Sequence, residues 1–270
     1  MSAASDDAPI GVFDSGLGGL TVLRALIDLL PGEQMVYFGD TGRFPYGPKP
    51  RDEVRAHALE IADLLVERGV KALVVACNSA AAAALDELRG RYDIPVVGVI
   101  EPGLQAGMSV TTTGRVGVIG TVGTIASGAY QELAAAIDPG VELTCAACPG
   151  FVEFVEAGDV DSDQVHVLAE RLLAPVRAAD VDTLVLGCTH YPLLARTIGD
   201  AMGRDVVLVS SADETAFAVR DLLAEEKMLV STRNGADHTF LTSGSVETFR
   251  QLGGRFLGPE VSAVEGWRWS

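Results

Sequence analysis

Two apolar segments of the chain repeat one another, and both end in a cysteine. VKALVVACNS (residues 70–79) and VDTLVLGCTH (residues 181–190) align without a gap at an offset of 111 residues. A second pair, IGVFDSGLG (10–18) and VGVIGTVGT (116–124), aligns at an offset of 106 residues. Each half therefore begins with a strand that ends in a turn containing glycine. A later strand ends in a cysteine, which is Cys77 in the first half and Cys188 in the second. The repeat predicts two similar domains related by a rough two-fold.

Short, nearly continuous apolar runs alternate with segments of helical periodicity. Runs such as QMVYFGD and DVVLVSSA are typical of strands buried on both faces, which are the strands of parallel sheets covered by helices. The predicted fold class is α/β: two pseudo-symmetric domains, each a parallel sheet flanked by helices, with the active site in the cleft between them. We expect a discontinuous first domain (1–102 plus 212–270) and a second domain (103–211). The first boundary is placed near EPGLQAG, where Pro and Gly interrupt the pattern.

Composition limits the classes of function. The chain has 270 residues, of which 48% are hydrophobic and 21% charged, as in ordinary globular proteins. No apolar run approaches the roughly 20 residues that span a bilayer, and MSAASDDAPI does not resemble a signal peptide, so we expect a cytoplasmic protein. A formal net charge of −17 argues against binding to nucleic acid or to an anionic membrane. An anionic substrate remains compatible with this charge, because helix N-termini offer free N–H groups.

The two strand-end cysteines suggest a particular chemistry. Ligands of open α/β sheets bind at the carboxyl ends of the strands, so two facing domains would bring Cys77 and Cys188 to one cleft. We expect a helix to begin after each cysteine, and its positive end to lower the thiol pKa. A thiolate and a thiol on opposite sides of a carbon can remove one proton and deliver another, which inverts its configuration. The alternative for each cysteine alone is a small buried hydrophobic residue.

Other motifs are less specific. His190, two residues after Cys188, is a candidate for proton relay or substrate orientation, and Asp14 at the first strand end is a candidate site carboxylate. DSGLGG fails as a dinucleotide fingerprint because Thr21 stands at its third position. The C-x-x-C formed by Cys145 and Cys148 lacks a second ligand pair, so a metal or dithiol role is disfavoured.

Several of these motifs together resemble one family, glutamate racemase. The residues that carry the resemblance run in order from about residue 9 to FRQLGGRFLG and include GVFDSGLGGLTVLRAL, GDTGRFPYGPK, VVACNSAAA, GVIEP, GVIGT, CPGFVE and LVLGCTHYPLL. The resemblance implies interconversion of L- and D-glutamate without cofactor or metal, which supplies D-glutamate for peptidoglycan. It also implies two pseudo-symmetric α/β domains with the substrate between them.

The resemblance assigns roles residue by residue. Cys77 and Cys188 match the two acid/base thiols, Asp14 matches the carboxylate beside the first, and His190 matches the imidazole beside the second. The positions that match substrate contacts are Asp14, Ser15, Tyr46, Gly47, Asn78, Ser79, Thr189 and His190. A late glutamate assists the second thiol in the family; here CPGFVEFVE offers Glu153, where Pro is usual, and Glu156, at the matching place, and we assign the role to Glu156. Asp40 is interpreted as a turn cap near the site.

Some alternatives stay open. Racemases of aspartate or hydantoins and a decarboxylase of arylmalonates share the architecture, although two strand-end cysteines favour racemisation. A non-catalytic binding or regulatory protein would use the same cleft without exchanging the substrate's Cα proton. The resemblance implies a homodimer, and it leaves an interaction with DNA gyrase open, since no residue here bears on it.

Overall fold

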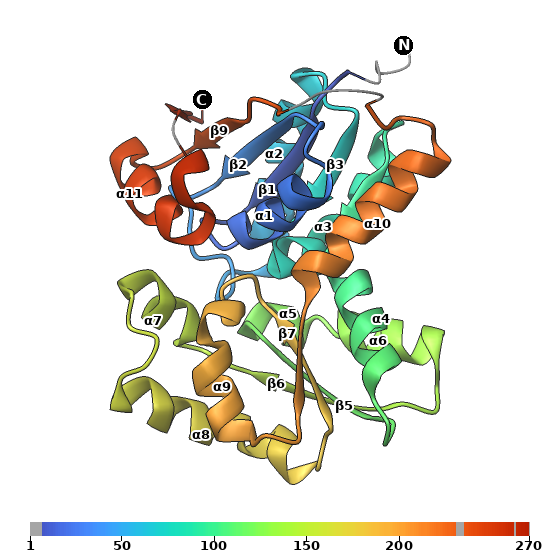
Figure 1. Cartoon of the computed structure of the whole chain (residues 1–270), viewed down its shortest axis with the longest axis vertical. Helices are drawn as coiled ribbons and strands as arrows, with labels where there is room; N and C mark the ends of the chain where they lie inside the picture. The colour runs from blue at the N-terminus through green and yellow to red at the C-terminus, as the bar shows by residue number, and fades with distance from the viewer. Residues whose placement is uncertain (1–6, 231–234, 262, 270) are drawn as a thin grey trace.

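The strands form two parallel sheets, one above the other (Figure 1). The computed structural model of the chain describes residues 7–230, 235–261 and 263–269. Within these residues, six strands form the first sheet in the order β10-β9-β2-β1-β3-β4, and four form the second in the order β6-β5-β7-β8, with every pairing parallel. The predicted α/β class with two parallel sheets is confirmed. The strand bounds are β1 Ile10–Asp14, β2 Met35–Gly39, β3 Ala72–Val75, β4 Val96–Gly98, β5 Arg115–Gly120, β6 Glu142–Ala147, β7 Thr183–Gly187, β8 Val207–Ser210, β9 Thr239–Thr242 and β10 Val264–Gly266.

The internal repeat extends to the register of the strands. Four strands of the first sheet have the order β2-β1-β3-β4, which is the order of β6-β5-β7-β8 in the second. Ile10 pairs with Ala72 in the first sheet, and Val116 pairs with Thr183 in the second. These two pairs are related by the same offsets that align the sequences. Each cysteine therefore follows a strand in the interior of its own sheet.

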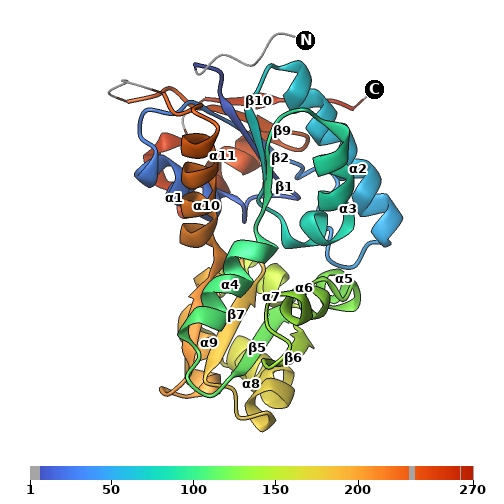
Figure 2. The same ribbon diagram turned by 90° about the vertical axis from the view of Figure 1, so that its right-hand side faces the viewer.

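Helices cover both faces of the first sheet, as strands that are apolar throughout require. One face packs against α2 and α3, and the other against α1, α10 and α11 (Figures 1 and 2). Both layers are built from buried aliphatic and aromatic side chains, with Phe13 and Val75 facing one layer and Val12 and Val74 facing the other. The helix bounds are α1 Leu20–Leu29, α2 Arg51–Glu67, α3 Asn78–Arg91, α10 Ser211–Glu225 and α11 Val246–Leu257, and a short 3-10 helix, η2, spans Gly258–Glu260.

The second sheet is covered in the same way. Side chains of β5 and β7 pack against α4 and α6 on one face, in a core that continues into the α2–α3 layer of the first sheet, and against α8 and α9 on the other. Two short helices, α5 and α7, lie near the junction of the two sheets (Figure 1). The bounds are α4 Ile100–Val110, α5 Val122–Ala126, α6 Ala129–Ile137, α7 Phe151–Ala157, α8 Asp163–Ala178, η1 Tyr191–Leu194 and α9 Ala195–Met202.

Pro and Gly do not interrupt the secondary structure at EPGLQAG, as the sequence suggested, because this segment lies inside α4. Pro102 is in the first turn of the helix, where a missing N–H costs no helical hydrogen bond. Gly103 and Gly107 allow close packing: a Cβ at Gly103 would lie 2.7 Å from Ser211 Cβ, and a Cβ at Gly107 would lie 2.4 Å from Val185 Cγ2. The glycines therefore serve contact with α10 and β7 rather than a turn.

The chain crosses between the two sheets twice. Figures 1 and 2 show α4 leading from the first lobe into the second and α10 leading back, after which β9 and β10 join the first sheet. The division into 1–102 plus 212–270 and 103–211 stays a prediction. In the part of the chain that the structure describes, none of the helices has the length and apolar character needed to cross a membrane.

Candidate active site

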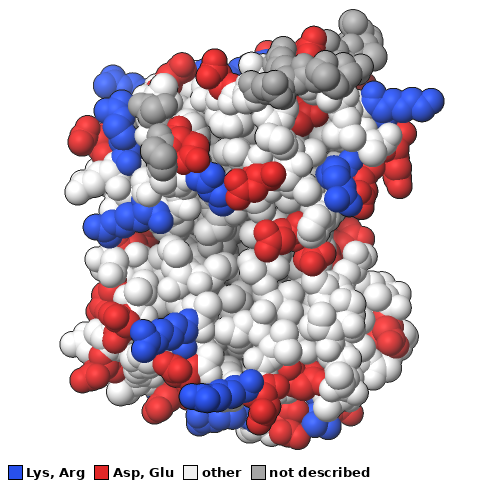
Figure 3. Space-filling model, viewed as in Figure 1, with Lys and Arg blue, Asp and Glu red and all other residues white. Residues whose placement is uncertain are grey.

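A cavity between the two sheets collects almost all of the predicted site residues. Its walls include both cysteines and every predicted substrate contact: Asp14, Ser15, Tyr46, Gly47, Cys77, Asn78, Ser79, Cys188, Thr189 and His190. Among the described residues no Lys or Arg lines it, whereas Asp14 and Glu153 do. Figure 3 shows one face of the molecule, on which the surface between the two lobes is uncharged at the left and centre and carries acidic side chains at the right. An anionic ligand in this cavity would therefore depend on O–H and N–H donors, among them the ring of His190.

Cys77 lies where the repeat predicts it, after β3 and at the N-cap of α3. Its side chain is buried, and the thiol donates to Ser15 Oγ at 3.6 Å. Burial and the negative charge of Asp14 raise the pKa of Cys77, although hydrogen bonds from the backbone of Ala80 and from Ser15 oppose them. The expectation that the helix start lowers this pKa is wrong, because desolvation outweighs the helix N-terminus. Cys77 is therefore a protonated thiol at neutral pH.

Asp14, at the end of β1, is held by the Gly-rich turn. Its Oδ2 accepts hydrogen bonds from the backbone N–H groups of Gly16 and Gly19, each at 3.1 Å. The other oxygen, Oδ1, is buried and has no partner among the described residues. Thr21, in the first turn of the helix α1 that follows this turn, donates from Oγ1 to the backbone oxygen of Thr189 at 3.4 Å, so this segment also contacts the opposite half of the molecule. A buried carboxylate with one free oxygen is suited to receive a cationic group of a ligand.

Cys188 follows β7, but the expected α-helix does not begin directly after it. The chain instead makes a turn, continues as η1, and becomes the α-helix α9 only at Ala195. The N–H of Tyr191 bonds to the oxygen of Cys188 at 3.1 Å, an i→i+3 bond typical of a tight turn. This turn places His190 Nδ1 at 3.9 Å from Cys188 Sγ. The second thiol therefore has an imidazole beside it rather than a helix N-terminus.

His190 joins Cys188 to a carboxylate. Its Nε2 lies 2.7 Å from Glu156 Oε1, and its ring is almost fully buried. Burial alone would lower the pKa of His190, but the contacts with Cys188 and Glu156 and the charge of Asp14 outweigh it and raise the pKa to about 10. The ring is therefore an imidazolium at neutral pH, and it places a positive charge beside Cys188 Sγ.

Both glutamates of α7 lie near the cavity, but they face different partners. Glu156 contacts His190, whereas Glu153 lines the cavity and its side chain is exposed. The structure therefore brings the glutamate that the sequence favoured to the imidazole.

Asn78 and Ser79, the first residues of α3, are bonded to the opposite half of the molecule. Asn78 Nδ2 donates to Tyr130 Oη at 2.9 Å. Ser79 Oγ lies 2.9 Å from Thr121 Oγ1 and 3.2 Å from Thr124 Oγ1. The helix that begins beside Cys77 is thus fixed to residues of the half that carries Cys188.

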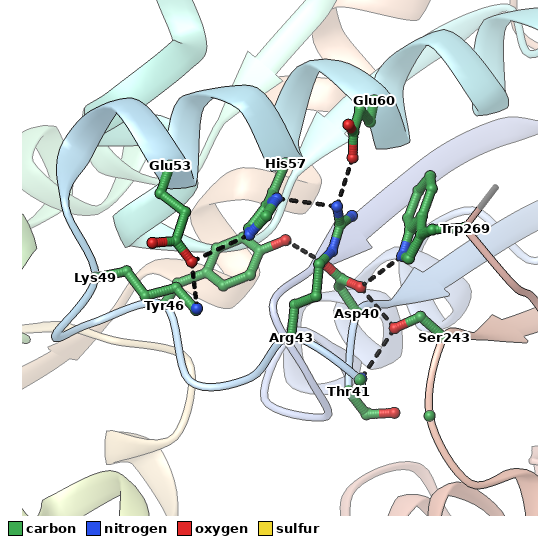
Figure 4. A network of polar contacts seen from close by, with 12 residues as sticks. Asp40, Thr41, Arg43, Tyr46, Lys49, Glu53, His57, Glu60, Ser243 and Trp269 are labelled. Atoms are coloured by element: carbon green, nitrogen blue, oxygen red, sulfur yellow. Dashed lines mark hydrogen bonds and ion pairs between the residues drawn. The ribbon is translucent and has the colours of Figure 1, made fainter.

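Tyr46 reaches the cavity from a loop that is held by a buried carboxylate (Figure 4). Asp40 has no exposed surface, and its Oδ2 accepts from the hydroxyl of Tyr46 and, at 2.7 Å, from Arg43 Nε. Its Oδ1 accepts from Ser243 Oγ at 2.6 Å and from Trp269 Nε1 at 3.3 Å. Asp40 is therefore more than the turn cap that the sequence suggested, because it fixes the tyrosine of the cavity to the C-terminal segment.

The C-x-x-C pair is divided between two environments. Cys145 lies within β6 and is half-buried, whereas Cys148 is buried and lines the cavity. Burial raises the pKa of Cys145 to about 11. Across the described residues no group of three His, Cys, Asp or Glu side chains is arranged to hold a metal ion. The pair gives no support to a metal centre.

Sequence reasoning missed several residues of the cavity wall. The repeat could have found Thr121, because it aligns with Ser15 at the offset of 106 residues. The apolar members of the wall had no predicted role, although all except Val122 lie within GDTGRFPYGPK and CPGFVE; they are Phe44, Pro45, Pro48, Val122, Pro149 and Val152. Their position follows from how the two halves face each other.

Comparisons with known proteins agree with this geometry. The sequence profile of the Asp/Glu/hydantoin racemases matches residues 10–219. The chain belongs to the Asp/Glu/hydantoin racemase family, and it is therefore an amino-acid isomerase. A relative in Mycobacterium leprae, a glutamate racemase, is 56% identical over 95% of this chain and 94% of its own length.

Solved structures of glutamate racemases are similar to this one over nearly the whole chain. The RacE1 isoform from Bacillus anthracis superposes with a TM-score of 0.92 at 41% identity, covering 98% of each chain. The enzyme from Francisella tularensis, solved with D-glutamate, gives a TM-score of 0.91 at 35% identity, covering 97% of this chain and 98% of that one. An aspartate racemase from Picrophilus torridus, at 17% identity and a TM-score of 0.57, shares the fold.

Proposed function

We propose that this chain is a cofactor-independent glutamate racemase that uses Cys77 and Cys188 as its two acid/base groups. The observation that carries the proposal is that two thiols, each at the end of an interior strand of its own sheet, line one cavity. The glutamate racemases that match the chain over almost its full length support glutamate as the substrate.

The two thiols differ in their surroundings, which suggests how a turnover begins. Cys188 has an imidazolium beside it and serves as the base, whereas buried Cys77 keeps its proton and serves as the acid. Cys188 removes the Cα proton from one face of the amino acid, and Cys77 delivers its proton to the other face. After one inversion the two groups have exchanged protonation states, and the opposite enantiomer reacts in the reverse direction.

The cavity provides groups for each part of the substrate. Asp14 Oδ1 and Asn78 Oδ1, which are buried acceptors without partners among the described residues, suit the α-ammonium. Hydroxyls of Ser15, Ser79 and Thr189 and N–H groups at the start of α3 suit the carboxylates. The hydroxyl and N–H donors must also stabilise the carbanion. In a mechanism without cofactor or metal, this stabilisation comes from preorganised donors in a site from which water is excluded.

The test is incubation of the purified protein with L-glutamate alone in deuterated water, with L-aspartate in parallel. We expect loss of optical rotation and deuterium at Cα of the product, unaffected by EDTA or by hydroxylamine, which traps carbonyl cofactors. Reaction of aspartate but not glutamate would overturn the substrate, and inactivity with both would favour a binding protein. Inhibition by EDTA or hydroxylamine would overturn the cofactor-independent mechanism.

The cellular role follows from the product. We propose that the enzyme supplies D-glutamate for peptidoglycan in the cytoplasm, and the chain should then rescue growth of a bacterium that depends on added D-glutamate. Failure of a soluble, active protein to rescue would contradict this role. The predicted homodimer is checked by light scattering of the purified chain.

A further inference from the structure

The hydroxyl of Tyr130 links the two halves of the proposed site. Tyr130 lies in the first turn of α6 and is completely buried, packed in the core that joins both sheets. Its Oη accepts a hydrogen bond from Asn78 Nδ2 at 2.9 Å. Asn78 directly follows Cys77, so a side chain from the half that carries Cys188 holds a residue adjacent to the other thiol.

This bond determines which end of the Asn78 amide remains for a ligand. The side chain of Asn78 lines the cavity, and only 3% of the residue is exposed. With the NH₂ group turned toward Tyr130, the oxygen Oδ1 is left buried and without a partner among the described residues. An unpaired buried acceptor is unfavourable. The amide is therefore set to receive a donor, which for an amino acid is the α-ammonium.

A glycine makes room for this hydroxyl beside the second thiol. A Cβ at Gly187 would lie 3.0 Å from Tyr130 Oη and 2.7 Å from the backbone oxygen of Ile119. The repeat aligns Gly187 with Ala76, so the two halves differ at the residue that precedes each cysteine. The hydroxyl thus lies between the backbone before Cys188 and the side chain after Cys77.

We propose that Tyr130 is a positioning residue that fixes the Asn78 amide with its oxygen toward the substrate's α-ammonium. The inference rests on the proposed function, because it names the group of the amino acid that Asn78 recognises. Tyr130 acts through Asn78 and does not itself line the cavity.

The test is Tyr130→Phe, which removes one oxygen atom and keeps the ring. We expect KM for glutamate to rise roughly tenfold, the usual scale of a lost hydrogen bond to a charged group. The inhibition constant of glutarate, which has both carboxylates but no ammonium, should change less than twofold. Asn78→Ala should give the same glutamate-specific loss, and adding Tyr130→Phe to it should change KM little further.

A matched control is Tyr92→Phe, since the Tyr92 hydroxyl donates to Asp63 Oδ1 at 2.6 Å and neither residue lines the cavity. It should leave both constants unchanged. If Tyr130→Phe weakens the binding of glutamate and glutarate equally, the inference is overturned, because the amide would then bind a carboxylate. If the variant changes neither KM for glutamate nor the inhibition constant of glutarate, the inference is overturned as well. Failure of the wild-type protein to racemise glutamate would instead refute the proposed function. If Tyr130→Phe does not fold, Asn78→Ala can still overturn the inference, because equal weakening of glutamate and glutarate by that variant would show that the amide does not face the ammonium.

Discussion

Glu156→Gln tests whether the carboxylate behind His190 sets the upper pH limit of racemisation. Gln keeps an oxygen within reach of His190 Nε2, which lies 2.7 Å from Glu156 Oε1, but it removes the negative charge. Glu156 is one of the groups that raise the pKa of His190 to about 10. A charge-assisted hydrogen bond contributes roughly 1.5–3 kcal/mol, and 1.36 kcal/mol corresponds to one pH unit. The pKa of His190 should therefore fall by about one to two pH units in the variant.

The direction of the pH effect follows from which protonation state of His190 supports racemisation. The imidazolium is the protonated form of His190, so activity that depends on its positive charge is lost as pH rises through the pKa of His190. The wild-type kcat/KM profile should fall near pH 10, and that of Glu156→Gln should fall at about pH 8–9. The same pKa, raised above the ordinary value of 6.5, also stabilises the fold most at low pH, and this contribution is lost as pH approaches about 10.

The assay is the pH dependence of kcat/KM, measured by circular dichroism in both directions. Glu153→Gln is the matched control, because Glu153 is three residues away on the same helix, whereas the carboxylate that bonds to His190 Nε2 is that of Glu156. Its alkaline limb should stay at the wild-type pH. An unchanged limb in Glu156→Gln, or a shifted limb in Glu153→Gln, would refute the assignment of Glu156 as the partner of the imidazole.

Three further predictions concern the thiols, the junction of the halves and the core. Cys77→Ser and Cys188→Ser should each lower kcat at least a hundredfold, because a hydroxyl is a much weaker base than a thiolate; near-normal rates in either would contradict the two-base mechanism. Gly18→Ala should lower kcat/KM tenfold or more without unfolding the protein, because the added Cβ would lie 2.3 Å from Oγ1 of Thr189, the residue after Cys188. Normal kinetics in this variant would show that the two halves can move apart without loss of activity. Lys71→Met should lower the free energy of unfolding in urea by about 3–5 kcal/mol, because Glu33, 2.6 Å from Lys71 Nζ, would remain as a buried charge; a loss below about 1 kcal/mol would contradict this.

The sequence by itself determined the class of fold and the place of the two thiols. Strands that are apolar throughout must be covered on both faces, and the repeated segments must occupy equivalent places, which the pairing of Ile10 with Ala72 and of Val116 with Thr183 reproduces. Local patterns failed where neighbours decide the outcome. Pro102 lies in the first turn of α4, where its missing N–H costs no helical hydrogen bond. Gly103 and Gly107 belong to the same helix because they allow close contact with α10 and β7, and the local sequence does not show these neighbours.

Only the tertiary structure decided the electrostatics of the site. The sequence placed a helix start after Cys77 and so predicted a lowered pKa, but the extent of burial and the approach of Asp14 depend on residues far apart in the chain. The pairing of Glu156 with His190 and the approach of Tyr130 to Asn78 likewise arise where the two halves meet. Periodicity records which side of a strand or helix is buried. It contains no information on which polar atoms meet across a cleft, because that depends on how two separately folded layers are set against each other.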